Sequence, residues 1–210
     1  MLLKLYNKLF KSAYNFSIVR TVLFNIIHLK SIAPNLFIGK RTSLINKGGR
    51  LSVQGKVYID SKNGGQFFYD SHMVLEQNSS LTFGNNVNFF SGAQIKCFEN
   101  SKICIGSNTY FSGPVTIHSK NMIYIGSKCS ISWGVTIIDS DFHAIGNRSI
   151  SSQKVIIEDN VWIGCNVTIL KGVFIHNGSI IAGGSVLTRP TTQKGIYAGN
   201  PAKLIKILDE

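Results

Sequence analysis

Residues 155–189 read VIIEDNVWIGCNVTILKGVFIHNGSIIAGGSVLTR and divide into six-residue units that follow one pattern. An aliphatic residue holds the same place in each unit, and the residue two positions before it is Val or Ser. Three positions after it stands Asn or Gly, the residue types that most readily adopt positive φ, so a tight corner is predicted there. The aliphatic positions are Ile157, Ile163, Ile169, Ile175, Ile181 and Leu187.

The same spacing recurs upstream and reaches back, in looser form, to about residue 38. A period of six fits neither an α-helix, which repeats every ~3.6 residues, nor a simple alternating strand. It fits a solenoid with triangular coils, in which three hexapeptides supply three short strands and three corners. A β-sandwich is the alternative, but it would place turns every ~8–12 residues. The sequence therefore predicts an all-β solenoid, a parallel β-helix of hexapeptide repeats.

The repeat divides the chain into three predicted parts. Residues 1–37 form an N-terminal helical lead-in, residues 38–190 form the β-helix with a loop at 138–156, and residues 191–210 form a C-terminal tail. A chain of 210 residues fits one domain, because domains usually contain ~100–200 residues.

Positive charge is concentrated at the N-terminus. Residues 1–50 contain nine Lys or Arg and no Asp or Glu, out of a net charge of +12 for the chain. Residues 1–16 place apolar and lysine side chains on two faces of a predicted helix. Such a helix either packs on the domain or attaches to an anionic membrane surface or acidic polymer. Nothing in the chain resembles a nucleic-acid-binding module, so no nucleic acid is expected as a partner.

The cysteines and the N-terminal residues indicate the compartment. Four scattered cysteines without C-x-x-C spacing are typical of small buried residues in a reducing compartment, so neither a disulfide nor zinc is expected. Lysines recur through the first eleven residues, which disfavours a signal peptide, and the later apolar run is too short to span a bilayer. We expect a cytoplasmic protein, with the inner face of the membrane as one possible location.

The longest break in the repeat lies between Ile137 and Ile157, and it contains Asp139, Asp141 and His143. Acyl transfer to a hydroxyl needs a base that titrates near neutrality, and histidine has an ordinary pKa of ~6.5. A nearby carboxylate can fix the ring tautomer that leaves the other nitrogen free. We therefore expect His143 to act as the base; either Asp139 or Asp141, or a backbone carbonyl, could orient it.

The stretches SWGVTIIDSDFHAI, residues 132–145, and VIIEDNVWIGCNVTILKGVFI, residues 155–175, resemble the hexapeptide-repeat acyltransferases, in particular the maltose, galactoside and lipopolysaccharide O-acetyltransferase branch. The resemblance covers about three quarters of the chain. It implies a left-handed β-helix, a loop histidine as general base, and a homotrimer with active sites at subunit junctions. It also implies that Trp162 lines the acetyl end of a coenzyme A tunnel.

The stretch GSIIAGGSVLTRPTTQKGIYAGNPAKLIK, residues 178–206, is similar to the coenzyme-binding end of the same family. The resemblance implies that small residues contact the pantetheine arm of acetyl-CoA and that basic residues approach its phosphates. Cys165 is read as a structural thiol, because no histidine or cation stands beside it in the sequence. The residues carried over are Cys165, Gly183, Thr188, Arg189, Lys203 and Lys206.

The expected function is an acetyl-CoA-dependent O-acetyltransferase that acts on a sugar hydroxyl. The lead-in RTVLFNIIHLK, residues 20–30, is similar to polysaccharide-modifying members, which favours a cell-surface polysaccharide or its precursor as acceptor. N-acetylation of an amino-sugar nucleotide and a non-enzymatic β-helix that binds acidic polymer or membrane remain alternatives. A zinc hydratase on the same scaffold would need three convergent histidines, and the H-x-x-x-x-H spacing is absent, so no metal is expected.

Overall fold

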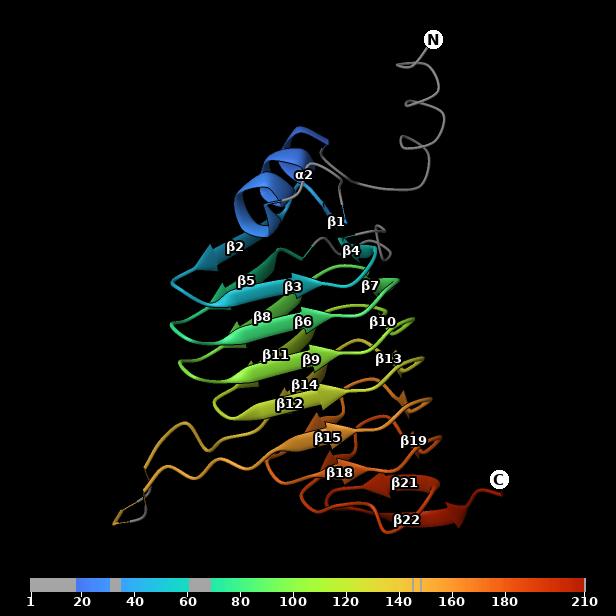
Figure 1. Ribbon diagram of the computed structural model, residues 1–210. Helices are drawn as coiled ribbons and strands as arrows, with labels where there is room; N and C mark the ends of the chain where they lie inside the picture. The colour runs from blue at the N-terminus through green and yellow to red at the C-terminus, as the bar shows by residue number, and fades with distance from the viewer. Residues whose placement is uncertain (1–17, 31–34, 61–68, 145, 148, 210) are drawn as a thin grey trace.

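The protein is a parallel β-helix whose coils stack into a triangular prism (Figure 1). The computed structural model describes residues 18–30, 35–60, 69–144, 146–147 and 149–209. The solenoid predicted from the six-residue period is confirmed. Residues 1–16, for which an amphipathic helix is predicted, lie outside the described residues.

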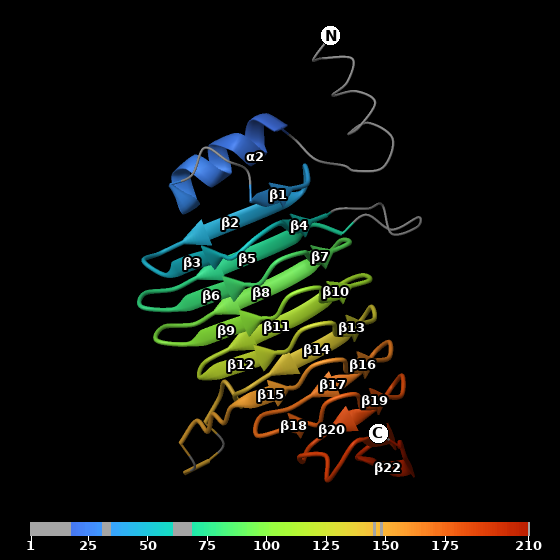
Figure 2. The ribbon, with the colours of Figure 1, turned by 45° about the vertical axis from the view of Figure 1, so that its right-hand side comes forward.

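Three sheets, parallel except for the last strand β22, form the faces of the prism, and Figures 1 and 2 show two views of them. The strands of the first sheet are β1 (Leu36–Ile38), β4 (Val57–Ile59), β7 (Val87–Phe89), β10 (Tyr110–Phe111), β13 (Ser130–Ile131), β16 (Trp162–Ile163), β19 (Ile180–Ile181), β21 (Gly195–Gly199) and β22 (Ala202–Ile207). Those of the second sheet are β2 (Thr42–Asn46), β5 (Ser71–Leu75), β8 (Ala93–Cys97), β11 (Val115–Ser119), β14 (Val135–Ile138), β17 (Thr168–Ile169) and β20 (Val186–Leu187). Those of the third sheet are β3 (Arg50–Val53), β6 (Ser80–Phe83), β9 (Lys102–Ile105), β12 (Met122–Ile125), β15 (Val155–Ile157) and β18 (Phe174–Ile175).

The core consists of the ladder residues, which stack from coil to coil. Ile157 is in register with Ile125 on one side and with Ile175 on the other, and all three are fully buried. Burying an Ile side chain stabilises the fold by about 1.5–3 kcal/mol, so each coil depends on its neighbours for stability. In the N-terminal half Phe89 stacks on Phe111, with ring centroids 4.2 Å apart.

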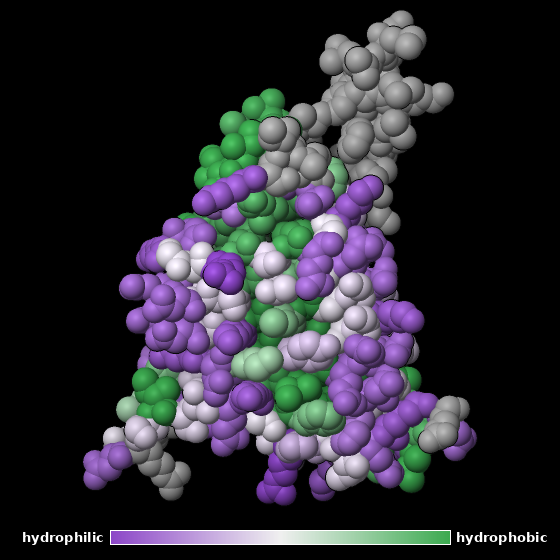
Figure 3. All heavy atoms as spheres, viewed as in Figure 1, coloured by the Kyte–Doolittle hydropathy of each residue, from purple (hydrophilic) through white to green (hydrophobic). Residues whose placement is uncertain are grey.

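The corners follow the predicted residue types. Asn160, Asn166 and Gly172 each have φ between 56° and 78°, which places the predicted left-handed residues at the turns. Outward-facing residues of the third sheet form an apolar band along that face of the prism (Figure 3). Tyr124 and Ile156 are half-buried members of this band.

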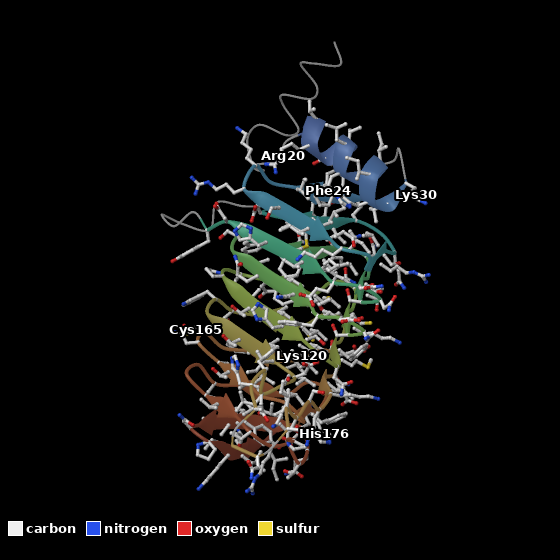
Figure 4. The ribbon with its side chains drawn as sticks, turned by 90° about the vertical axis from the view of Figure 1, so that its left-hand side faces the viewer. Arg20, Phe24, Lys30, Lys120, Cys165 and His176 are labelled. Atoms are coloured by element: carbon white, nitrogen blue, oxygen red, sulfur yellow. The ribbon has the colours of Figure 1, made fainter. Side chains whose placement is uncertain are left out.

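A short helix covers the N-terminal end of the prism. It comprises α2 (Ile18–Phe24) and a π-helical turn, η1 (Asn25–Leu29). The fully buried Asn25 side chain ties it to β1, because its amide donates to the carbonyl of Leu36 and its oxygen accepts from the N–H of the same residue. Figure 4 shows Arg20 and Phe24 on this helix and Lys30 directly after it. Among the described residues, no helix is long and apolar enough to cross a membrane.

Two additions interrupt the regular prism near its C-terminal end. An insertion lies between β14 and β15 and protrudes from the edge between the second and third sheets, at the lower left of Figure 1. An antiparallel bridge between Ser140 and Ser152 closes its base. Where the tail was predicted, β21 and β22 form an antiparallel pair that extends the first sheet.

Candidate active site

The insertion presents His143 to solvent on a backbone that is fixed at its base. The N–H of Asp141 donates to the carbonyl of Ser151 (3.0 Å), and the N–H of Gln153 donates to that of Asp139 (2.9 Å). The N–H of His143 then donates to the carbonyl of Asp141 (2.7 Å), which bends the chain just before the imidazole. The ring itself is exposed, so it can meet a substrate without displacing other side chains.

Asp139 is fully buried and its carboxylate faces the turn between β11 and β12. It accepts hydrogen bonds from the hydroxyl of Ser119 (2.6 Å) and from the N–H groups of Lys120 (2.7 Å) and Asn121 (2.9 Å). Within the described chain neither Asp139 nor Asp141 is hydrogen bonded to the ring of His143. These contacts make Asp139 a structural residue that fixes the start of the insertion, and they disfavour it as the orienting partner.

Asp141 pairs with Lys171, which lies between β17 and β18 in the following coil. The two side chains are 36% and 27% exposed, so the ion pair is only partly shielded from water. Exposed pairs of this kind contribute about 0–1 kcal/mol to stability. The contact therefore serves mainly to connect the insertion to the prism at Asp141, two residues before His143 in the chain.

Aromatic side chains of the second sheet's edge pack against the insertion at Phe142. Phe142 has a φ of 59°, and its ring centroid lies 5.3 Å from that of Phe98 and 6.4 Å from that of His118. The ammonium group of Lys120 lies 5.5 Å from the Phe142 centroid. Burial lowers the pKa of His118, and the charge of the nearby Lys96 lowers it further. Through its ring contact with Phe142, His118 helps to pack the insertion against the prism.

The residues expected to bind the coenzyme fall into two groups. In the first group, Trp162 lies on the outer face of β16 with 54% of its surface exposed, and Cys165 follows at the edge between the first and second sheets. The N–H of Gly184 donates to the carbonyl of Cys165 (2.8 Å). A Cβ atom placed on Gly183 would lie 3.2 Å from the Cys165 sulfur. Cys165 and Gly183 are thus stacked in adjacent coils.

The register of the first sheet brings a lysine into line with Trp162. Trp162 pairs with Ile180, Ile180 pairs with Ile196, and Ile196 pairs with Lys206. A bulge at Ile196 and Tyr197 shifts the last pairing, so that Lys203 opposite Ala198 and Lys206 opposite Ile196 share the outer face. Three strand spacings of about 4.8 Å separate Trp162 from Lys206.

The second group lies on another edge. Thr188 and Arg189 directly follow β20 and are exposed at the edge between the second and third sheets, as is the insertion with His143. Figure 4 shows Cys165 and Lys120 toward opposite edges of the second sheet. A single chain therefore holds Trp162, Cys165 and Gly183 apart from His143, Thr188 and Arg189.

A groove with a volume of about 520 Å³ lies at the edge between the first and second sheets. Among its lining residues, sequence reasoning identified only Asn166, as a corner residue. Its lining continues the column of corners in which Cys165 and Gly183 stand. The lining residues are Tyr69, Ser91, Ser112, Gly113, Pro114, Trp133, Gly134 and Asn166.

The profile of the bacterial transferase hexapeptide family (six repeats) matches residues 154–189. The crystal structure of the polysialic acid specific acetyltransferase NeuO superimposes with a TM-score of 0.66 at 25% identity, covering 82% of this chain and 72% of NeuO. The chain is similar in sequence and in fold to the bacterial hexapeptide-repeat transferases. The polysialic acid O-acetyltransferase OatWY is a further structural neighbour of this transferase, with a TM-score of 0.59 at 25% identity over 82% of this chain and 84% of OatWY. The fold is thereby the left-handed β-helix expected from the resemblance.

Relatives by sequence carry transferase names as well. WbbJ of Escherichia coli, named as a lipopolysaccharide biosynthesis O-acetyl transferase, is 28% identical over 63% of this chain and 74% of its own length. An acetyltransferase of Saccharomyces cerevisiae is 34% identical over 59% of this chain and 65% of its own length. A tetrahydropyridine-dicarboxylate N-acetyltransferase of Clostridium perfringens is 48% identical over 60 residues, which are only 25% of that protein.

Three features of this transferase were missed by sequence reasoning. Lys171 and Phe98 contact the insertion from other coils, and such contacts have no local sequence signal. Trp133 does have one, because a large aromatic residue stands in a corner between Ser132 and Gly134, where small residues prevail elsewhere in the repeat. Among the described residues, no group of three or more His, Cys, Asp and Glu side chains could hold a metal ion.

Proposed function

We propose that this transferase moves the acetyl group of acetyl-CoA to a hydroxyl of a sugar in a cell-surface polysaccharide or its precursor. The observation that carries the proposal is the exposed imidazole of His143 on an insertion anchored by backbone hydrogen bonds and by the Asp141–Lys171 ion pair. The similarity to WbbJ, NeuO and OatWY supports a glycan hydroxyl as acceptor.

His143 is proposed as the general base. Its neutral ring accepts the proton of the acceptor hydroxyl while the oxygen attacks the thioester carbonyl. The carbon–sulfur bond then breaks, and the coenzyme A thiolate takes up the proton from His143. General-base assistance of this kind accelerates a reaction by about 10²–10⁴-fold. Asp141 is the better candidate for orienting the ring, because the Asp139 carboxylate is occupied by Ser119, Lys120 and Asn121.

Acetyl-CoA is proposed to lie along the first sheet and its edge. The exposed face of Trp162 lines the acetyl end, while Cys165 and Gly183 offer a small-residue track for the pantetheine arm. Lys203 and Lys206 are exposed on the face that Trp162 occupies, at a distance suited to phosphate groups. Thr188 and Arg189 reach the coenzyme from a neighbouring copy, because they lie on the edge that carries His143.

A homotrimer is also proposed, because one chain does not bring the candidate residues together. The two groups of candidate residues lie on different edges of one prism, so a complete site needs the edge with His143 from one copy and the edge with Trp162 from the next. Rotational symmetry repeats such a junction three times. A monomeric mass in light scattering at assay concentrations would contradict the trimer.

Complementation tests the shared site directly. His143→Ala and Trp162→Ala are each expected to be nearly inactive alone. Mixed trimers of the two variants should recover activity at about a quarter of their sites, because random assembly joins two intact halves at that frequency. Mixtures without any recovery, prepared by co-expression so that subunits assemble together, would place both residues in one subunit's site.

Transfer of labelled acetyl from acetyl-CoA to sugars, sugar nucleotides and surface polysaccharides tests the reaction. Wild type should form an alkali-labile ester, and His143→Ala should lose it while still binding coenzyme A. His72→Ala is the matched control, because His72 is also an exposed histidine but lies on β5. An alkali-stable amide would move the function to N-acetylation, which the short match to the Clostridium perfringens enzyme favours as second candidate.

A cytoplasmic location at the inner face of the membrane is also proposed. The helical segment formed by α2 and η1 supports it, because Val19, Leu23 and Ile27 are 70%, 52% and 66% exposed at the end of the prism. The described cations Lys30 and Lys40 are exposed at the same end. An apolar helix face flanked by basic side chains is suited to an anionic lipid surface.

A further inference from the structure

The groove at the edge between the first and second sheets is built by a ladder of glycines. A Cβ atom on Gly92 would lie 2.8 Å from the Cβ of Tyr69. A Cβ atom on Gly113 would lie 2.6 Å from the Cβ of Trp133. Two large aromatic side chains thus pack over positions where only glycine leaves room, and both remain strongly exposed, Tyr69 at 46% and Trp133 at 54%.

The described lining of the groove is aromatic and polar. Ser91, Ser112 and Asn166 supply hydroxyl and amide groups between the two aromatic rings. None of the described residues that line the groove is acidic or basic. Exposed aromatic faces bind flat apolar surfaces, and hydroxyl and amide groups exchange hydrogen bonds with neutral hydroxyls. A pyranose ring presents both kinds of surface.

The groove adjoins the track proposed for the coenzyme. The N–H of Asn166 donates to the carbonyl of Trp133 (2.9 Å), and Asn166 directly follows Cys165 in the chain. Trp133 therefore stands one coil from Cys165, on the side away from Lys203 and Lys206. A ligand in the groove would lie at the end of the coenzyme track opposite to the cations.

We propose that this groove is a glycan-binding subsite in which the indole ring of Trp133 stacks on a neutral pyranose ring of the acceptor. The proposal rests on the proposed acetyl transfer to a sugar. It adds the place and the chemistry of acceptor binding: stacking on Trp133 and Tyr69, with hydrogen bonds to Ser91, Ser112 and Asn166. Loss of the Trp133 ring should weaken glycan binding by about tenfold or more, given typical stacking energies.

Binding without turnover tests the subsite. The His143→Ala protein is applied, without acetyl-CoA, to an array of immobilised neutral and acidic oligosaccharides and polysaccharides. We expect binding to at least one neutral glycan, loss of that binding with an added Trp133→Ala, and partial retention with Trp133→Phe. Tyr110→Ala is the control, because Tyr110 is an exposed aromatic residue of β10, 42% accessible, that does not line the groove.

Four results would overturn the proposal. They are the absence of any glycan bound by His143→Ala, equal binding after Trp133→Ala, a loss of coenzyme A affinity in Trp133→Ala measured by calorimetry, and a change of molecular mass in the same variant. The third result would assign the groove to the coenzyme, and the fourth to contact between copies. Glycan binding that depends on Trp133, together with no acetyl transfer by wild type, would reject the proposed enzyme function and keep the subsite.

Discussion

The ammonium group of Lys171 pairs with the carboxylate of Asp141 and thereby holds the insertion with His143 against the following coil. Because the pair is partly exposed, Lys171→Met should change the stability of the protein by less than about 1 kcal/mol. It should lower kcat several-fold, because the ring of His143 is then less well positioned. Steady-state kinetics and thermal denaturation check both expectations. Lys154→Met, an exposed lysine at the end of the insertion, is the control, and an unchanged kcat in Lys171→Met would contradict the positioning role.

Asp139 and Asp141 should separate into a structural and a positioning residue. In Asp139→Asn an NH₂ group replaces either Oδ1, where it faces the N–H of Lys120, or Oδ2, where it faces the N–H of Asn121 and the hydroxyl of Ser119. Losing hydrogen bonds to a buried charged acceptor costs about 1.5–3 kcal/mol each, so a substantial loss of unfolding free energy is expected. Asp141→Asn should keep its stability and lose kcat. Urea unfolding alongside kinetics distinguishes them, and equal stability in both variants would refute the division.

The sequence predicts the repeated part of the structure well because the ladder is a local signal. Ile157 and its equivalents identify the interior in every unit, and Asn160 or Gly172 identifies the corner, without knowledge of any distant contact. His143 stands out for a similar reason, since it lies in the longest break of the pattern. The strand boundaries at the insertion are set by hydrogen bonds such as Ser140 with Ser152, which have no such periodic signal.

The surroundings of the site could not be predicted, because they depend on which coils are stacked. Phe98 and Phe142 are 44 positions apart in the chain and meet only because the insertion folds back on the second-to-third edge. Asp139 is a different case. Its position near Asp141 and His143 in the sequence suggested a catalytic role, but in the structure its carboxylate accepts a hydrogen bond from the turn at Lys120. Trp133 was present in a quoted motif, but its exposure and the space above Gly113 are properties of the coil stack.

Gly113→Ala should disturb Trp133 more than it disturbs the fold elsewhere. The added Cβ would lie 2.6 Å from the Cβ of Trp133, which cannot rotate away as a flexible side-chain end could. Overpacking of this kind costs about 1–3 kcal/mol. In a Trp162→Phe background Trp133 is the single tryptophan, so its emission reports the shift directly. Gly146→Ala is the control for backbone strain without overlap, because Gly146 has a φ of 56° and its Cβ would meet nothing within 4 Å. Identical spectra before and after Gly113→Ala would contradict the packing.

The protein should lose stability on acidification through His118. Burial, reinforced by Lys96, lowers the pKa of this histidine below its ordinary value of 6.5. Between the two values the unfolded chain binds a proton that the folded chain does not, so the free energy of unfolding falls as pH falls below 6.5. His118→Gln should flatten this dependence in urea unfolding measured across that range. Titration of the His118 ring by NMR at or above 6.5 in the folded protein would contradict the expectation.

Membrane attachment through α2 and η1 should depend on the exposed apolar face of this helical segment. Leu23 and Ile27 are 52% and 66% exposed, so replacing both by Glu removes apolar surface and adds negative charge without emptying the core. Sedimentation with vesicles that contain anionic phospholipid should show binding by wild type and loss of binding by Leu23→Glu/Ile27→Glu. Val74→Glu, a half-buried residue on the outer face of β5, controls for added negative charge away from the helix. Binding should also weaken with salt, since basic side chains near the surface contribute about 1 kcal/mol each. Equal sedimentation of wild type and the double variant would exclude the helix as the attachment surface, and transfer activity on soluble acceptors would be unaffected in either case.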